Sequence, residues 1–506
     1  MVEISRKDVT KWYLFFQYVY IVIAFINGIV IVPFYLHFID NSLYGAWLAS
    51  GSILVWLSLL DPGVGEVFQQ RVAIAFGKSD KESLKNIISS GFFIGLIIFI
   101  ICLIISYPLA IIIPNIIKYT DSIFIGELIF AFKISAIGTA FTMFAYPITG
   151  INTGLQGTKI IGLITVPIQL LSIIITLVLL YKGYGLLSIA YSVLFRGISY
   201  VIFDTFYLLW LINQNKIGYG FNFNFFISFS KIFSYTFFSK SITVIAENID
   251  LILISRFINQ ESVIILEFTR RPIKLALNIL RRISVAFMPA MAHLKGENNN
   301  EKIKHIFLRL INIVLWIGYL LFFGFICFNK NLIAIWIGND LFIGNSINIL
   351  LNIFFFIGGI TYTISNITFS LGNIKGNSLI SVLKGILTIS LMVVLGYLLD
   401  IWGIIIAPLI ALILSEAWYY PLKISKMISL GPRDFYKIGK EGILIIGCSI
   451  VITLGLFYLK MNNWTILIFS AILFTVLYFL CLYLISSSFR TEFNYVFITI
   501  KRKLLK

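Results

Sequence analysis

The sequence predicts an all-α protein that crosses a membrane many times. Apolar residues make up 59% of the 506 residues, charged residues only 12%, and the mean hydropathy is +0.97. Water-soluble globular domains do not have this balance. Apolar runs of about 20 residues, long enough to cross a hydrocarbon core of roughly 30 Å, recur from end to end. We count about fourteen such runs and predict as many transmembrane helices. An internal repeat groups twelve of them into two six-helix bundles related by a pseudo-twofold axis, followed by two further C-terminal helices.

The predicted spans follow the apolar runs in chain order. They lie at 13–36, 43–67, 87–113, 123–147, 160–181, 186–212, 230–256, 262–289, 305–328, 342–370, 379–399, 403–425, 440–459 and 463–485. The first run is too long for the apolar region of a signal peptide, and no small-residue cleavage site follows it, so we expect it to remain as a span.

Basic residues set the predicted orientation. They gather in alternate connections, such as those holding Lys78, Lys81 and Lys85 or Lys302 and Lys304, and in the C-terminal tail. By the positive-inside rule these connections are cytoplasmic, and both termini lie on that side. Much of the net charge of +17 then reflects topology. No basic segment is long enough to form a separate module, so we expect no nucleic-acid partner.

The residues that usually carry catalysis or metal binding are scattered. Each of the four cysteines lies singly in an apolar run, and each of the three histidines lies singly in or beside a connection. Neither type has metal-ligand spacing or a nucleophile partner. The stretch GLQGTK at 154–159 lacks the spacing of a phosphate-binding P-loop. We therefore predict a protein that is not an enzyme and has no catalytic residues, metal site or resident cofactor.

An internal repeat appears when the sequence is aligned with itself at a constant offset that places Ala73 over Ala292. The stretch AIAFGKSDKESLKNI (73–87) then overlays AHLKGENNNEKIKHI (292–306), and Gly157 overlays Gly376. Each copy holds six predicted spans, an even number, so both copies enter the membrane in the same orientation. The predicted parts are an N-terminal lobe at 1–218, a C-terminal lobe at 219–430, and spans 13 and 14 with the tail at 431–506. Two such bundles flanking a central cavity are typical of alternating-access transporters.

Four stretches resemble a known family. LDPGVGEVFQQRVAIAFGKSDKESL (60–84), IDLILISRF (249–257), WIGNDLF (336–342) and TFSLGNIKGNSLISV (368–382) are similar to Wzx-type polysaccharide-unit flippases. These belong to the multidrug/oligosaccharidyl-lipid/polysaccharide (MOP) exporter superfamily. The resemblance implies that the chain moves an undecaprenyl-pyrophosphate-linked oligosaccharide across the bacterial cytoplasmic (inner) membrane. The product would be O-antigen of lipopolysaccharide, capsule or a similar polymer, and a polymerase and a chain-length regulator would be partners beside the membrane lipid.

Span 8 carries a stripe of cations at membrane depth. On a helix of about 100° per residue, Arg270, Arg271, Lys274, Arg281 and Arg282 all fall within about 60° of Glu267. Because such a face cannot point at lipid, we expect it to line an aqueous cavity. One guanidinium group can bind two phosphate oxygens at once. We therefore predict that these residues bind the pyrophosphate, together with Arg196 in span 6. The alternative is that the cations only neutralise nearby carboxylates.

Two other groups of charges are candidates for ion coupling or gating. In span 7, Lys240, Glu247 and Asp250 share one helix face. With Glu267 they would either bind a coupling H⁺ or Na⁺ or form ion pairs with the span 8 cations.

Span 2 contains Asp61-Pro62-Gly63 and then Glu66, for which we predict a kinked or unwound turn. At the offset of the repeat Asp61 corresponds to Leu280, and Asp61 or Glu66 could pair with Arg281 or Arg282 to close the cytoplasmic side. The alternative is a kink with solvated charges at a helix end.

Three other function classes remain open. A cation-coupled multidrug exporter of the same superfamily usually has twelve spans, and five cavity cations would repel its substrates. A peptidoglycan-precursor flippase shares the fourteen-span plan. A membrane-embedded glycosyltransferase or polymerase resembles chains with a long external loop, whereas the external connections here are short.

Overall fold

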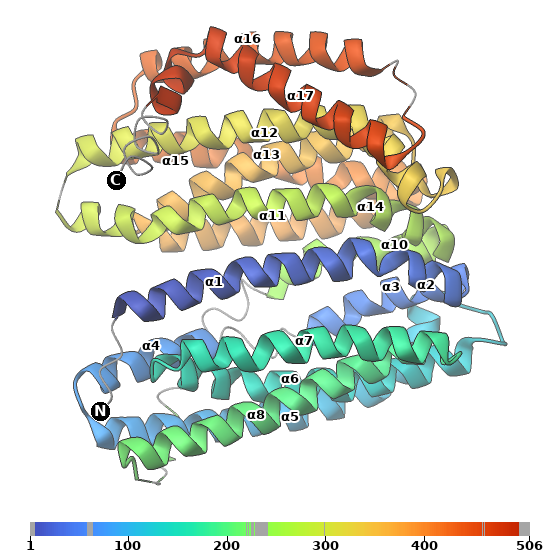
Figure 1. Cartoon of the computed structure of the whole chain (residues 1–506), viewed down its shortest axis with the longest axis vertical. Coiled ribbons are helices and arrows are strands. Elements are labelled where there is room, and N and C mark those ends of the chain that lie inside the picture. The colour runs from blue at the N-terminus through green and yellow to red at the C-terminus, as the bar shows by residue number, and fades with distance from the viewer. Residues whose placement is uncertain are drawn as a thin grey trace. The chain divides into compact units, whose positions relative to one another are not determined.

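The computed structural model describes residues 6–57, 64–218, 220, 222, 223, 227, 241–297, 299–457, 459 and 461–494 (Figure 1). The secondary structure over these ranges is helical and contains no strand, which confirms the predicted all-α class. The chain divides into two compact units, Met1–Ile264 and Ile265–Lys506. The boundary between them falls inside one long helix, α11 (Gln260–Gly296). The lobes at 1–218 and 219–430 come from the sequence repeat and remain a prediction.

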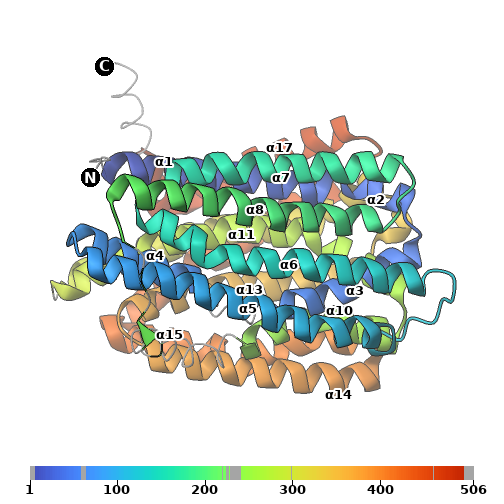
Figure 2. The ribbon, with the colours of Figure 1, turned by 90° about the horizontal axis from the view of Figure 1, so that it is seen from below.

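The first unit is a bundle built around one central helix. Its helices are α1 (Arg6–Phe25), η1 (Ile26–Val30), α2 (Val32–Phe38), α3 (Asn41–Leu57), α4 (Val64–Gly77), α5 (Lys81–Ile116), α6 (Ile125–Gly154), α7 (Thr158–Tyr181), α8 (Leu187–Asn215) and α10 (Asp250–Phe257). Helix α6 lies between α5 and α8 (Figure 2). A Cβ atom on Gly197 of α8 would overlap the carbonyl oxygen of Gly138. The two backbones thus approach closely, as small residues allow in membrane bundles.

The second unit contains the remaining long helices. These are α11 (Gln260–Gly296, beginning in the first unit), α12 (Asn300–Trp336), η3 (Asn339–Leu341), α13 (Asn345–Ser370), α14 (Ile374–Leu414), α15 (Glu416–Ile428), α16 (Pro432–Phe457) and α17 (Trp464–Ile485). Helices α16 and α17 correspond to predicted spans 13 and 14, and they pack against α12. Phe323, Cys327 and Phe474 are buried in the core that joins them.

Helix α14 contains a reversal of the chain. Asp400 has φ 49° and ψ −133°, which is outside helical geometry. A Cβ on Gly403 would overlap the carbonyl oxygen of Leu395. In a continuous helix these two residues would lie about 12 Å apart along the axis. The chain therefore folds back here, and the segment Ile374–Ile428 holds the two spans predicted at 379–399 and 403–425.

The helices agree with fourteen spans. Ten helical segments in the described part of the chain are long and apolar enough to cross a membrane, and the segment that reverses at Asp400 counts twice. The other three predicted spans are polar or interrupted: 43–67 contains the undescribed residues 58–63, 230–256 is described only in part, and 262–289 carries the cations of α11. The chain is a multi-pass membrane protein.

Helix starts and caps recur at the offset of the sequence repeat. Asp40 accepts a hydrogen bond from the backbone N–H of Leu43, and Asn259 accepts one from Ser262 in the same way. Asp80 caps α5 through the N–H of Ser83, as Asn299 caps α12 through Lys302. Hydrogen bonds from the hydroxyl and backbone N–H of Ser83 lower the pKa of Asp80. Asp and Asn both cap helices well. The helix starts are therefore the same in both copies, although the second copy has a neutral Asn where the first has a charged Asp.

Candidate functional site on helix α11

Helix α11 is held in the second unit by its apolar and small polar face. Ile273, Leu277 and Leu280 are buried on this face. The Nδ2 of Asn329 on α12 donates to the carbonyl oxygen of Thr269 at 2.9 Å, and Asn366 on α13 donates to the hydroxyl of Ser284 at 2.9 Å. At about 100° per residue these packed positions lie roughly 80° to 160° away from the direction of Glu267. The packing therefore leaves the charged stripe on another side of the helix.

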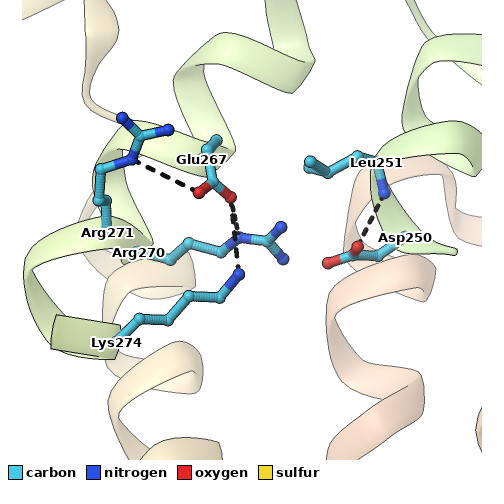
Figure 3. A network of polar contacts seen from close by, with 6 residues as sticks. All are labelled: Asp250, Leu251, Glu267, Arg270, Arg271 and Lys274. Atoms are coloured by element: carbon cyan, nitrogen blue, oxygen red, sulfur yellow. Dashed lines mark hydrogen bonds and ion pairs between the residues drawn. The ribbon is translucent and has the colours of Figure 1, made fainter. Parts of the chain in front are cut away.

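Three cations of the stripe converge on one carboxylate (Figure 3). The Nε of Arg270 lies 2.6 Å from Oε2 of Glu267, which is a short charge-assisted hydrogen bond. The Nε of Arg271 lies 3.5 Å from Oε1, and the Nζ of Lys274 lies 3.6 Å from Oε2. Glu267 thus neutralises part of the stripe from within the same helix. This is the kind of ion pairing that the alternative interpretation of the sequence, mutual neutralisation of cations and carboxylates, expects.

The neutralisation within these four side chains is incomplete and uneven. Three cations share one anion, so positive charge is in excess in this cluster. The exposed fraction of the side chains rises from 8% for Arg270 through 17% for Arg271 to 38% for Lys274. Arg270 falls at the edge of the stripe, about 20° from Leu277 on the packed face, whereas Lys274 falls near its centre. Arg270 is therefore the buried structural partner of Glu267, and Lys274 presents most of the accessible charge.

Further along the same helix, Arg281 and Arg282 differ from each other. The guanidinium carbon of Arg281 lies 5.0 Å from the ring centroid of Tyr362 on α13, a cation–π contact. Its Nε is buried and has no hydrogen-bond acceptor among the described residues. The side chain of Arg282 is exposed. Sequence reasoning placed both residues on the stripe, but it could not find Tyr362, which lies on another helix far along the chain.

The two carboxylates of predicted span 7 differ in burial. Glu247 is exposed, whereas Asp250 is buried at the start of α10 and its Oδ1 accepts the N–H of Leu251 at 2.9 Å (Figure 3). Their shared helix face and their ion-coupling role remain predictions. Lys240 and Asp61 lie outside the described residues, as does the turn predicted at 61–63, and the side chain of Glu66 is not described.

Helix α8 carries Arg196, a predicted headgroup contact, and also a buried carboxylate, Asp204. Arg196 is half-buried, and Asp204, eight residues later, is only 2% exposed. Asp204 accepts a hydrogen bond from the hydroxyl of Thr149 on α6, and Asn152 donates to the carbonyl oxygen of Asp204 at 2.9 Å. The Oδ1 of Asp204 has no donor among the described residues. Since eight residues span about 12 Å of helix, Arg196 does not compensate this carboxylate directly.

The structure contains a further buried ion pair that sequence reasoning did not find. The Nζ of Lys384 on α14 lies 3.0 Å from Oε1 of Glu416, the first residue of α15. The two residues belong to different predicted spans, 379–399 and 403–425, so the sequence gives no sign that they pair. The reversal at Asp400 brings them together. This pair binds the two halves of a helical hairpin, which is a structural role.

The sequence matches one protein family over more than half of its length. The family is described as "Polysaccharide biosynthesis protein", and the match covers residues 68–341. The chain belongs to this polysaccharide biosynthesis protein family. The matched range includes most of the first unit and the whole of the cationic helix α11. A comparison with curated proteins gives no match.

Solved structures share the fold of this family member. The lipid II flippase MurJ in an inward closed conformation has a TM-score of 0.70 and 17% identity, covering 94% of this chain and 98% of its own. An inward-facing MATE family multidrug resistance transporter of the MOP superfamily has a TM-score of 0.63 and 15% identity, covering 81% and 96%. A MOP superfamily transporter from Pyrococcus furiosus has a TM-score of 0.53 and 17% identity, covering 82% and 93%. At these identities the likeness establishes the fold.

Proposed function

We propose that this protein is a Wzx-type flippase that moves undecaprenyl-pyrophosphate-linked oligosaccharides across the bacterial cytoplasmic membrane by alternating access, with both termini on the cytoplasmic side. The carrying observation is the cluster on α11, where three cations share one carboxylate and Lys274 keeps 38% of its side chain exposed. Clustered cations at membrane depth, one of them well exposed, suit an anionic ligand. The family match to polysaccharide biosynthesis and the flippase and exporter fold support an anionic, sugar-bearing lipid.

The geometry of the cluster suits a transient phosphate ligand. The 3.6 Å separation between Lys274 Nζ and Glu267 Oε2 is longer than a good hydrogen bond, so this contact with Glu267 is weak. Lys274 can exchange Glu267 for a phosphate oxygen without breaking the short bond that orients Arg270. Arg281 offers a second contact, because its Nε lacks an acceptor among the described residues. Arg196 and Arg282 remain proposed contacts with the same headgroup.

A coupling ion remains part of the proposal, and Asp204 is the group that best fits it. Its carboxylate is buried on α8, one oxygen accepts from Thr149, and the other has no donor among the described residues. A proton on that oxygen would relieve the burial of the charge. Asp250 and Glu247, chosen from their spacing, would be alternatives, with Na⁺ as the other candidate ion. If the chain serves surface-polymer synthesis, a polymerase and a chain-length regulator are its proposed protein partners.

The test compares two single-charge variants in proteoliposomes that contain a fluorescent undecaprenyl-pyrophosphate-linked oligosaccharide. Lys274→Gln should reduce flipping at least about ten-fold, because it removes the accessible charge. Lys375→Gln removes an exposed lysine from a predicted cytoplasmic connection and should flip at the wild-type rate. Wild-type flipping by Lys274→Gln would reject the cationic site.

The same vesicles separate the other function classes. A multidrug exporter would move organic cations and ignore the lipid-linked sugar. A peptidoglycan-precursor flippase would prefer lipid II. This class stays an alternative because the chain shares the fold of the lipid II flippase MurJ. A polymerase or glycosyltransferase would lengthen the glycan rather than only change its leaflet.

A further inference from the structure

A surface cavity of about 750 Å³, open to the outside, is formed by residues of the first unit at one end of its helices. Three segments line it: the turn from α2 into α3 around Asp40, the start of α6 around Glu127, and the turn between α7 and α8 around Tyr184. All three belong to connections that the positive-inside rule predicts as extracytoplasmic. The volume is in the range of small-molecule binding sites.

Two carboxylates of the cavity are fixed in place by backbone groups. Asp40 accepts the N–H of Leu43 at 3.0 Å, and Glu127 accepts the N–H of Leu186 through Oε1 at 2.8 Å. An ionised carboxylate has about four acceptor sites, so each retains capacity for further donors. Both groups are therefore preorganised acceptors at the edge of the cavity.

Gly185 keeps Glu127 in this position. Its φ is +51°, and a Cβ built on it would lie 2.8 Å from Oε1 of Glu127. Any larger residue would strain the turn and push the carboxylate away. The sequence of the turn is thus adapted to a carboxylate that faces the cavity wall.

Aromatic rings supply the other part of the lining. Phe38, Phe124, Phe130 and Tyr184 line the cavity, and Phe130 and Tyr184 remain 49% and 46% exposed. An interfacial belt accounts for exposed aromatic rings but requires neither a cavity nor paired carboxylates. A sugar ring has apolar C–H faces, which aromatic rings can cover, and hydroxyl groups, which can donate to carboxylates. Such charge-assisted O–H···O⁻ hydrogen bonds are strong.

We propose that this cavity binds a sugar residue of the transported oligosaccharide at the extracytoplasmic side. The inference rests on the proposed flippase function for the source of the sugar, but the site itself is defined by the first unit alone. Its two carboxylates disfavour a pyrophosphate, so it binds the glycan and not the charged lipid end. The cations of α11 and the carboxylates around Tyr184 thus recognise opposite ends of one substrate.

Direct binding tests the site with the full-length protein in nanodiscs. The probe is the lipid-free repeat-unit glycan, released by mild acid from the surface polymer of the cell that makes this protein, and binding is measured by titration calorimetry. Tyr184→Ala should weaken it at least about ten-fold. Glu127→Gln keeps an acceptor for Leu186 and should weaken it about five-fold. Phe206→Ala removes a ring that is 74% exposed elsewhere in the unit and should bind as wild type.

Each outcome decides the proposal. Loss of glycan binding in Tyr184→Ala but not in Phe206→Ala supports the site, as does unchanged glycan binding in Lys274→Gln. No heat with the wild-type protein, or equal affinities for Tyr184→Ala and Phe206→Ala, rejects it. Binding of tetraphenylphosphonium at the cavity in place of the glycan would identify an organic-cation site and also reject it. Flipping by Lys274→Gln at the wild-type rate would reject the proposed function but not the glycan site, because calorimetry measures glycan binding independently of flipping.

Discussion

The cluster on α11 makes a prediction that separates structural from functional charges. Glu267→Gln removes the carboxylate that the three cations share. Leaving buried charges without their partner costs about 3–5 kcal/mol. Arg270→Gln removes one charged hydrogen bond of 2.6 Å from a side chain that is 8% exposed, a loss of about 2–3 kcal/mol. Lys274→Gln removes a long 3.6 Å contact with Glu267 from a side chain that is 38% exposed, so we expect solvent screening to limit the loss to under about 1 kcal/mol.

Thermal unfolding of the purified protein in detergent measures this order. At about 3 °C per kcal/mol for a unit of this size, Tm should fall by about 9–15 °C in Glu267→Gln and about 6–9 °C in Arg270→Gln. In Lys274→Gln it should fall by no more than about 3 °C. The double variant Glu267→Gln/Arg270→Gln removes one charge of each sign, so its loss should be clearly smaller than the sum of the two.

The transport assay completes the comparison. Lys274→Gln should combine near-wild-type Tm with lost flipping, whereas Arg270→Gln should lose both. If Lys274→Gln is as unstable as Arg270→Gln, or if the double variant is additive, then the division of the stripe into a buried partner and an accessible charge is wrong. Lys375→Gln controls for the loss of one exposed lysine.

Three further predictions concern the bundle interiors. Lys384→Met should lower Tm because it leaves the buried carboxylate of Glu416 unpaired, and Lys384→Met/Glu416→Leu should recover most of the loss; a double variant as unstable as the single would contradict the pairing. Gly403→Val should reduce the yield of folded protein because its side chain overlaps backbone at the reversal, while Gly455→Ala, with open space around it, should not; equal yields would contradict the tight turn. Asp204→Asn retains an acceptor for its hydroxyl donor, so expression should be unchanged while flipping loses its response to a pH gradient; a retained response would exclude this carboxylate as the coupling group.

Much of the fold could be predicted because membrane insertion leaves strong periodic signals. Apolar runs predicted the helices, and the constant offset of the repeat placed Asp40 opposite Asn259 and Asp80 opposite Asn299 before their shared capping roles were known. Span 8 was assigned from its apolar residues despite its charges, and the repeat then aligned it with span 2.

The division of roles within the site could not be predicted. Helical angles placed Arg270 and Lys274 on one face, but they do not say where the neighbouring helices cover that face. Arg270 is buried because α11 packs through Thr269, Ile273 and Leu277, and this packing depends on residues of α12 and α13. The glycan cavity was missed for the same reason, since its three segments meet only in the folded unit.

The repeat also bears on the two proposed sites. At its offset, Glu127 of the cavity corresponds to Ser346, and Tyr184 corresponds to Gly403. Conversely, Arg270, Arg271 and Lys274 correspond to Gly51, Ser52 and Val55. The two copies share helix starts and caps, so a common backbone does not require any of these side chains. Glu127 and Tyr184 thus occur in the first copy alone, and the three cations in the second copy alone. The proposed substrate, with a sugar at one end and a pyrophosphate at the other, would account for both differences on one repeated scaffold.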